Sequence, residues 1–135
     1  MLLTDIRGNW AASWILLVAR AGVMEPFANH AFQPNGVVRR SDLAQVVNSL
    51  LDKIAEAAPA QPRPWESSRI AFSDLAPGHL AYPAASAAVL SGVMTKGVND
   101  TFQPSAPVGG QEASAAVWRL EAMSRAALAA GAGAR

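Results

Sequence analysis

The side chains that could perform enzyme chemistry are few in this chain and lie far apart in the sequence. The 135 residues include no cysteine, and the two histidines, His30 and His79, have no companion ligand or base at a regular spacing. Asp5 and Asp74 each lack a partner carboxylate nearby, which leaves a glycosidase pair without support. Because no catalytic geometry can be assembled from these residues, the sequence predicts that the protein is not an enzyme.

Metal and cofactor sites are not predicted either. A zinc or iron site needs several histidine, cysteine or carboxylate ligands that converge, and the sequence offers no such cluster. The run Asn99-Asp100-Thr101 has the residue types of a calcium loop, but calcium takes about six oxygen ligands and further acids are missing. We interpret this run as a turn and expect no cofactor.

Charge and hydropathy exclude two classes of partner. The net charge is +1 and the longest basic run is the pair Arg39-Arg40, so a nucleic-acid groove is not expected. The most apolar stretch, from Trp10 to Ala19, is about half as long as the roughly 20 residues that span a bilayer, so no membrane span is expected. This stretch also lacks the basic start and cleavage site of a signal peptide, and any export signal is expected to lie outside this chain.

An internal repeat organises the chain. Gly22-Val23-Met24 recurs as Gly92-Val93-Met94, which sets an offset of 70 residues. Asp5 and Asp74 match at an offset of 69, and we expect both carboxylates to cap the first helix of their copy or to bind loop amides. The other identical pairs follow in order at the offset of 70: Asn29 and Asn99, Phe32-Gln33-Pro34 and Phe102-Gln103-Pro104, Val38 and Val108, Val47 and Val117, and Leu50 and Leu120.

Each copy is predicted to fold as helix, loop and helix, which makes the fold class all-α. In copy one, apolar residues recur at helical spacing in two segments and predict two stripes that face the core. Gly22 and Gly92 are expected to end the first helices with a positive φ angle, and Phe32 and Phe102 in the loops are expected to be buried. The first stripe comprises Trp10, Trp14, Leu17, Val18 and Ala21, and the second Leu43, Val46, Val47, Leu50, Leu51 and Ile54.

The repeat also predicts the domain organisation. Repeat one is expected to span residues 1–54 and repeat two residues 70–128. Residues 55–69 include three prolines and predict a stiff, extended linker between the repeats. Residues 129–135 are rich in alanine and glycine, and we expect them to form a flexible tail.

The repeated residues resemble those of the S-layer homology (SLH) domain family. Modules of this family are helical, usually occur as three repeats and pack with pseudo-threefold symmetry. The resemblance therefore implies two tandem SLH-like repeats, packed as an incomplete pseudo-threefold bundle. In copy two it rests on Phe72-Ser73-Asp74-Leu75, His79, Ala81-Tyr82, Gly92-Val93-Met94, Phe102-Gln103-Pro104 and Val108 to Glu112. In copy one it rests on Asp5-Ile6, Asn9-Trp10-Ala11, Gly22-Val23, Phe32-x-Pro34 and Val38 to Asp42.

The resemblance also implies a function at the cell envelope. SLH modules hold larger exported proteins to cell-wall polysaccharide, often pyruvylated, or to a peptidoglycan-linked polymer, and an arginine at the start of the second helix approaches the acidic sugar. Arg40 occupies that position in copy one, whereas copy two has Gly110 there. The resemblance thus implies an extracellular, non-catalytic anchor in which the guanidinium of Arg40 is accessible at the edge of a groove between repeats.

Three further residues complete the candidate ligand site. Arg39 either assists Arg40 or faces water, and Asp42 keeps the family's acidic position, where a carboxylate forms half of a capping box. Trp10 lies one helical turn before Trp14 and could form a stacking platform for sugar rings, although its spacing favours a place in the core.

A structural or assembly module that binds no sugar is the alternative hypothesis. The missing arginine at Gly110 favours it, whereas the pair Arg39-Arg40 favours anchoring. Two repeats leave an apolar flank that a second copy of the chain or another subunit can cover, so the partner would then be a homo-oligomer or a different protein.

Overall fold

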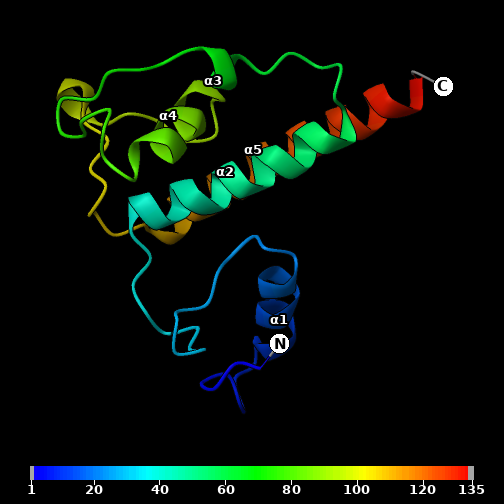
Figure 1. Ribbon diagram of the computed structural model, residues 1–135, viewed down its shortest axis with the longest axis vertical. Helices are drawn as coiled ribbons and strands as arrows, with labels where there is room; N and C mark the ends of the chain where they lie inside the picture. Colours follow the sequence, from blue (N-terminus) through cyan, green and yellow to red (C-terminus); the bar gives the residue numbers. More distant parts are fainter. Residues whose placement is uncertain (1, 134–135) are drawn as a thin grey trace. The chain divides into compact units, whose positions relative to one another are not determined.

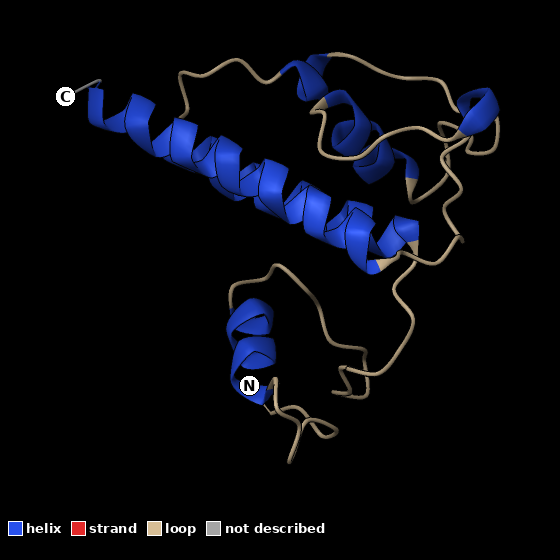
Figure 2. Cartoon of the chain, turned by 180° about the vertical axis from the view of Figure 1, so that it is seen from behind, coloured by secondary structure: helices blue, strands red, loops and turns tan. Residues whose placement is uncertain are grey.

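The computed structural model describes residues 2–133, which fold into helices joined by loops (Figure 1). No strand occurs among these residues (Figure 2), and the predicted all-α class is confirmed. Copy one supplies α1 and α2, copy two supplies α4 and α5, and α3 lies between the copies. The bounds are α1 Ala12–Arg20, α2 Arg40–Ala57, α3 Pro64–Ser67, α4 Tyr82–Leu90 and α5 Gly110–Gly133, with a short 3-10 turn, η1, at Val98–Asp100.

The two copies share their local structure at several corresponding positions, although η1 occurs in copy two alone. Helix α4 begins and ends 70 residues after α1, and α5 begins 70 residues after α2. Gly22 and Gly92 have φ angles of 73° and 84°, which confirms the predicted left-handed helix stop in both copies. Gln33 and Gln103, in the two loops, share positive φ angles of 56° and 59°. The repeat in the sequence is therefore also a repeat of backbone conformation.

The compact units of the chain do not coincide with the repeats. The chain divides into residues 1–37 and 38–135, so α2 of copy one belongs to the same unit as both helices of copy two. Residues 55–69, predicted to be an extended linker, contain α3, which packs on α4. Helix α5 continues to Gly133, where a flexible tail was predicted from residue 129, and residues 134 and 135 lie outside the described part. The pseudo-threefold packing stays a prediction.

Helix α4 is the core element of the larger unit and packs against both α2 and α3. Its residues Ala84, Ala85 and Ala88 are buried, because methyl side chains let neighbouring helices approach closely. Helix α2 also packs along α5, and the two run side by side in Figure 1. Phe102 is fully buried, as predicted, and its ring centroid lies 5.3 Å from that of Phe72.

The smaller unit has a separate, smaller core. Leu3, Ile6, Ile15 and Ala19 are buried together, and Phe32 packs against them while remaining partly exposed, so its expected burial is incomplete. The fold of this unit therefore depends on the segment before α1, which supplies two of the four buried side chains.

The first apolar stripe was assigned to the wrong face of α1. Trp10, Trp14 and Leu17 are 90%, 66% and 58% exposed, whereas Ile15, off the predicted stripe, is buried. The physical reason is that this nine-residue helix is apolar on nearly every side, so periodicity does not select one face. The segment before the helix determines which face of α1 is buried, because Leu3 and Ile6 pack on the side that carries Ile15.

Candidate functional site

An aspartate clasp closes the loop in each copy. The two carboxylate oxygens of Asp5 accept hydrogen bonds from the backbone N–H groups of Phe32 and Gln33, at 2.8 Å and 2.7 Å. Asp74 accepts the same pair of bonds from Phe102 and Gln103, both at 2.7 Å. The expected binding of loop amides is therefore confirmed in both copies.

The clasp affects the charge state of Asp5. The hydrogen bond from the Phe32 amide, followed by that from the Gln33 amide, holds the pKa of the Asp5 carboxyl below its ordinary value, because both bonds favour the ionised form. Asp5 is thus a structural carboxylate that stays ionised at neutral pH. Both of its oxygens are occupied by the loop, which makes it a poor general acid.

Arg40 is bound on several sides within the larger unit. Its Nε donates to the carbonyl oxygen of Phe102 at 2.7 Å, and its Nη2 donates to that of Thr95 at 2.6 Å. Its Nη1 forms an ion pair with the carboxylate of Glu112, and the guanidinium carbon lies 4.8 Å from the centroid of the Phe102 ring. The side chain is 11% exposed. We call these contacts the Arg40 clamp.

The clamp overturns the expectation that the Arg40 guanidinium is accessible at a groove edge. It joins the start of α2, from copy one, to the loop and the start of α5, from copy two. In copy two the positions that correspond to Arg39 and Arg40 are Gly109 and Gly110, so Glu112 has no arginine at these positions of its own copy. Sequence reasoning missed the pair because its partners lie 72 positions apart.

Arg39 and Asp42 lie at the same helix start. One carboxylate oxygen of Asp42 accepts a hydrogen bond from the backbone N–H of Arg39 at 2.9 Å, which is the capping contact expected of that position. The Arg39 side chain is exposed, and its Nη1 donates to the carbonyl oxygen of Ser105 at 2.7 Å. Of the two neighbouring arginines, Arg39 is the one whose guanidinium faces solvent.

Trp10 stands in solvent at the turn before α1. The side-chain oxygen of Asn9 accepts a hydrogen bond from the backbone N–H of Ala11 at 2.9 Å, which fixes this turn. His79 makes the corresponding contact in copy two, where its Nδ1 accepts from Ala81 at 3.0 Å, and Leu80 is 93% exposed there. Both copies therefore hold a large apolar side chain outward at this position. Asn9 and His79, which occupy corresponding positions of the two copies, accept equivalent backbone hydrogen bonds in this turn.

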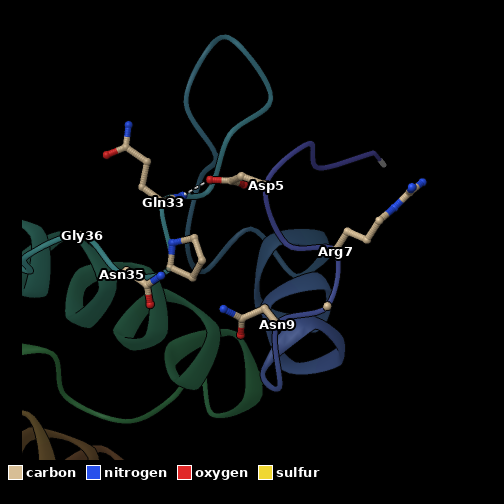
Figure 3. A pocket seen from close by; sticks show the side chains of 8 residues that line it. Asp5, Arg7, Asn9, Gln33, Asn35 and Gly36 are labelled. Carbon is tan, nitrogen blue, oxygen red and sulfur yellow. Dashed lines mark hydrogen bonds between the residues drawn. The ribbon is translucent and has the colours of Figure 1, made fainter.

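A polar hollow lies next to this turn in copy one (Figure 3). Its volume is about 480 Å³, and the amide side chains of Asn9 and Asn35 approach it from two sides, while Arg7 extends away from it. Amide groups both donate and accept hydrogen bonds, as sugar hydroxyls require. Asn35 was not among the candidate site residues deduced from the sequence. The hollow is lined by Asp5, Arg7, Gly8, Asn9, Gln33, Pro34, Asn35 and Gly36.

Two other kinds of site are not found in residues 2–133. No group of three or more histidine, cysteine or carboxylate side chains could hold a metal ion in this part of the chain. Among the same residues, no helix combines the length and apolar character that crossing a membrane requires. The candidate site thus consists of the hollow with Trp10 in the smaller unit and of Arg39 in the larger one.

Comparison with known families gives one match. The model of the family described as S-layer homology domain matches residues 2–44 and again residues 71–114, which together make up more than half of the chain. One match lies within each of the two copies deduced from the sequence, and the predicted family is confirmed. Neither a curated protein nor a solved structure matches the chain significantly.

Proposed function

The chain belongs to the S-layer homology domain family, and on that premise we propose that it anchors a larger exported protein to an acidic cell-wall polysaccharide. Domains of this family are non-catalytic and attach proteins to cell-wall polymers, which associates this chain with the cell surface. We further propose that the polymer is a pyruvylated or peptidoglycan-linked polysaccharide and that Trp10 and Arg39 contact it.

The observation that supports sugar binding is the exposure of Trp10, which directly follows Asn9, a residue that lines the hollow. An indole ring that is 90% exposed has an apolar face available to stack on a sugar ring. Asn9 lines the hollow together with Asn35, and their amides suit sugar hydroxyl groups. Copy one thus combines an apolar platform with polar groups, which is the usual composition of a small-ligand site.

Arg39 supplies the positive charge in this proposal. Acidic sugars carry carboxylates, which an arginine binds through two parallel hydrogen bonds. Arg40 has its guanidinium engaged in the clamp, and Asp42 caps α2, so both act as positioning residues for Arg39. Arg39 and Trp10 lie in different compact units, and each is proposed as a separate contact to a long polymer.

Sedimentation of the full chain with purified cell-wall sacculi tests the proposal. The chain should sediment with intact sacculi and should be released when their acidic polymer is stripped. Trp10→Ala should weaken binding by about 0.5–1.5 kcal/mol, the scale of an aromatic stacking contact. Leu80→Ala is the matched control, because Leu80 is equally exposed at the corresponding position of copy two.

Arg39→Ala tests the charge contact in the same assay. It should weaken binding most at low ionic strength, because salt screens exposed charges. A wild-type chain that ignores sacculi with and without the polymer would refute the anchor. Equal losses for Trp10→Ala and Leu80→Ala would refute the assignment of Trp10.

A further inference from the structure

Asn35 is the one asparagine of the chain that is followed by a glycine, and both Asn35 and Gly36 are exposed in the loop of copy one. The side-chain amide of an asparagine can react with the backbone nitrogen of the next residue, and a glycine at that position leaves the nitrogen unobstructed. The other asparagines precede a tryptophan, a histidine, a serine or an aspartate. Their backbone nitrogens are therefore harder to reach, which makes Asn35 the asparagine most open to spontaneous deamidation.

A hydrogen-bonded turn holds Asn35 in the folded chain. The backbone N–H of Gly36 donates to the carbonyl oxygen of Gln33 at 2.9 Å, which closes a four-residue turn with Pro34 at its second position. The Asp5 clasp fixes the start of this turn through the N–H of Gln33. The nitrogen of Gly36 must give up its proton before it can attack, and in the turn that proton is bound to Gln33. The folded turn therefore slows the reaction.

Copy two has the same turn without the reactive pair. Ser105 and Ala106 take the positions of Asn35 and Gly36, and the N–H of Ala106 donates to the carbonyl oxygen of Gln103 at 3.1 Å. Gly36 does not have the positive φ angle that favours glycine, although a methyl group on it would lie 3.1 Å from the carbonyl oxygen of Gln33. Copy two shows that a turn of this kind accommodates an alanine with a slightly longer hydrogen bond.

We propose that Asn35 is a modification site at which the chain converts one of its own amides to a carboxylate. The backbone nitrogen of Gly36 loses its proton and bonds to Cγ of Asn35, while the bond from Cγ to Nδ2 breaks and ammonia leaves. Water then opens the resulting five-membered imide ring at one of its two carbonyl carbons, which leaves an aspartate or an isoaspartate at position 35. Water is the only co-reactant, and nothing is oxidised or reduced.

The product changes the charge of the hollow in copy one, and the consequence for binding rests on the proposed function. Asn35 lines the hollow, as does the carboxylate of Asp5 (Figure 3). A second carboxylate there repels the acidic groups of the polymer, because like charges disfavour a shared site. Deamidation therefore weakens the binding of acidic polymer by copy one as the protein ages, and the turn that holds Gly36 sets how fast this happens.

Peptide mapping by mass spectrometry tests the modification. The full chain is incubated in mildly alkaline buffer with and without guanidinium chloride, and the peptide that contains Asn35 is followed for the mass increase that replacement of an amide NH2 by a hydroxyl gives. Conversion should be at least severalfold faster in the denaturant, because the turn is then open. Gly36→Ala should slow conversion in the denaturant, because its methyl group obstructs the nitrogen.

Asn29 is the internal control for this measurement. It is exposed in the same loop, but it is followed by His30, and it should stay unmodified over the same period. An Asn35 that stays unmodified in the denaturant, or that converts equally fast in Gly36→Ala, would overturn the proposal. Equal rates in the folded and the unfolded chain would overturn the protective role of the turn.

Sedimentation with purified sacculi tests the effect on binding separately. At low ionic strength Asn35→Asp should bind about threefold more weakly than Asn35→Ala, and added salt should remove the difference, because only the aspartate adds a charge. Equal binding by the two variants would overturn the effect of the new carboxylate. A wild-type chain that ignores sacculi would refute the proposed function instead, whereas the mass measurement would still decide whether Asn35 is modified.

Discussion

Replacing Arg40 with alanine should lower the free energy of unfolding even when no ligand is present. The change removes the ion pair to Glu112, the hydrogen bonds to Phe102 and Thr95, and the contact of the guanidinium with the Phe102 ring. These contacts join copy one to copy two within the larger unit. Their loss therefore weakens the packing of α2 on copy two, which separates this role from sugar binding.

The loss of stability from Arg40→Ala is expected to be about 2–4 kcal/mol. A hydrogen bond to a charged group contributes about 1.5–3 kcal/mol, but the bonds here share one side chain and do not add. Removing one member of a fully buried pair costs about 3–5 kcal/mol. Because the Glu112 side chain is 34% exposed, water can rehydrate its carboxylate and the cost is smaller.

Urea unfolding followed by far-ultraviolet circular dichroism measures the effect. Arg39→Ala is the matched control, because that neighbouring side chain is exposed and its removal should cost no more than about 0.5 kcal/mol. Glu112→Ala and the double variant complete a cycle, in which the coupling energy should be about 1–2 kcal/mol. Equal losses for Arg40→Ala and Arg39→Ala, or a coupling near zero, would refute the clamp.

Three further predictions concern stability and can be measured by thermal or urea unfolding. Acidification should destabilise residues 1–37, because the lowered pKa of Asp5 gives stability that is present above the pKa of the unfolded chain, about 3.9, and is lost as the pH falls through the folded value. Asp5→Asn should flatten this acid dependence. Phe102→Ala should cost about 3–5 kcal/mol and Phe32→Ala clearly less, because only Phe102 is fully buried; equal losses would contradict this. Ser86→Ala should stabilise by about 1 kcal/mol, because the buried Oγ of Ser86 has no hydrogen-bond partner in the described part of the chain. A loss of stability from this change would reveal a partner for the hydroxyl.

The sequence predicted the features that local chemistry determines. The helix stops at Gly22 and Gly92 followed from the need for a left-handed residue, and the structure has both. Binding of loop amides was one of the two roles expected for Asp5 and Asp74, and it is the role that the structure shows in both copies. These features depend on residues that are close in sequence or on one copy alone.

The sequence did not predict the features that depend on competition between distant segments. Trp10 was assigned to the core because its spacing matched a stripe, but Leu3 and Ile6 select another face of α1. The role of Arg40 was missed for a similar reason. The ion pair with Glu112 can be predicted only once α2 and α5 are known to be neighbours, and the spacing of apolar residues does not give that information.

The larger compact unit of this protein consequently combines the second helix of copy one with both helices of copy two. Helix α2 belongs to copy one by sequence, yet Val47 and Leu51 are fully buried in a core shared with α4 and Phe102 of copy two. An isolated segment 1–54 would leave these side chains without that core, at a cost of about 1.5–3 kcal/mol for each exposed residue. Copy two has Gly110 where copy one has Arg40, and the positive charge that pairs with Glu112 of copy two is supplied by Arg40 across the contact between the copies.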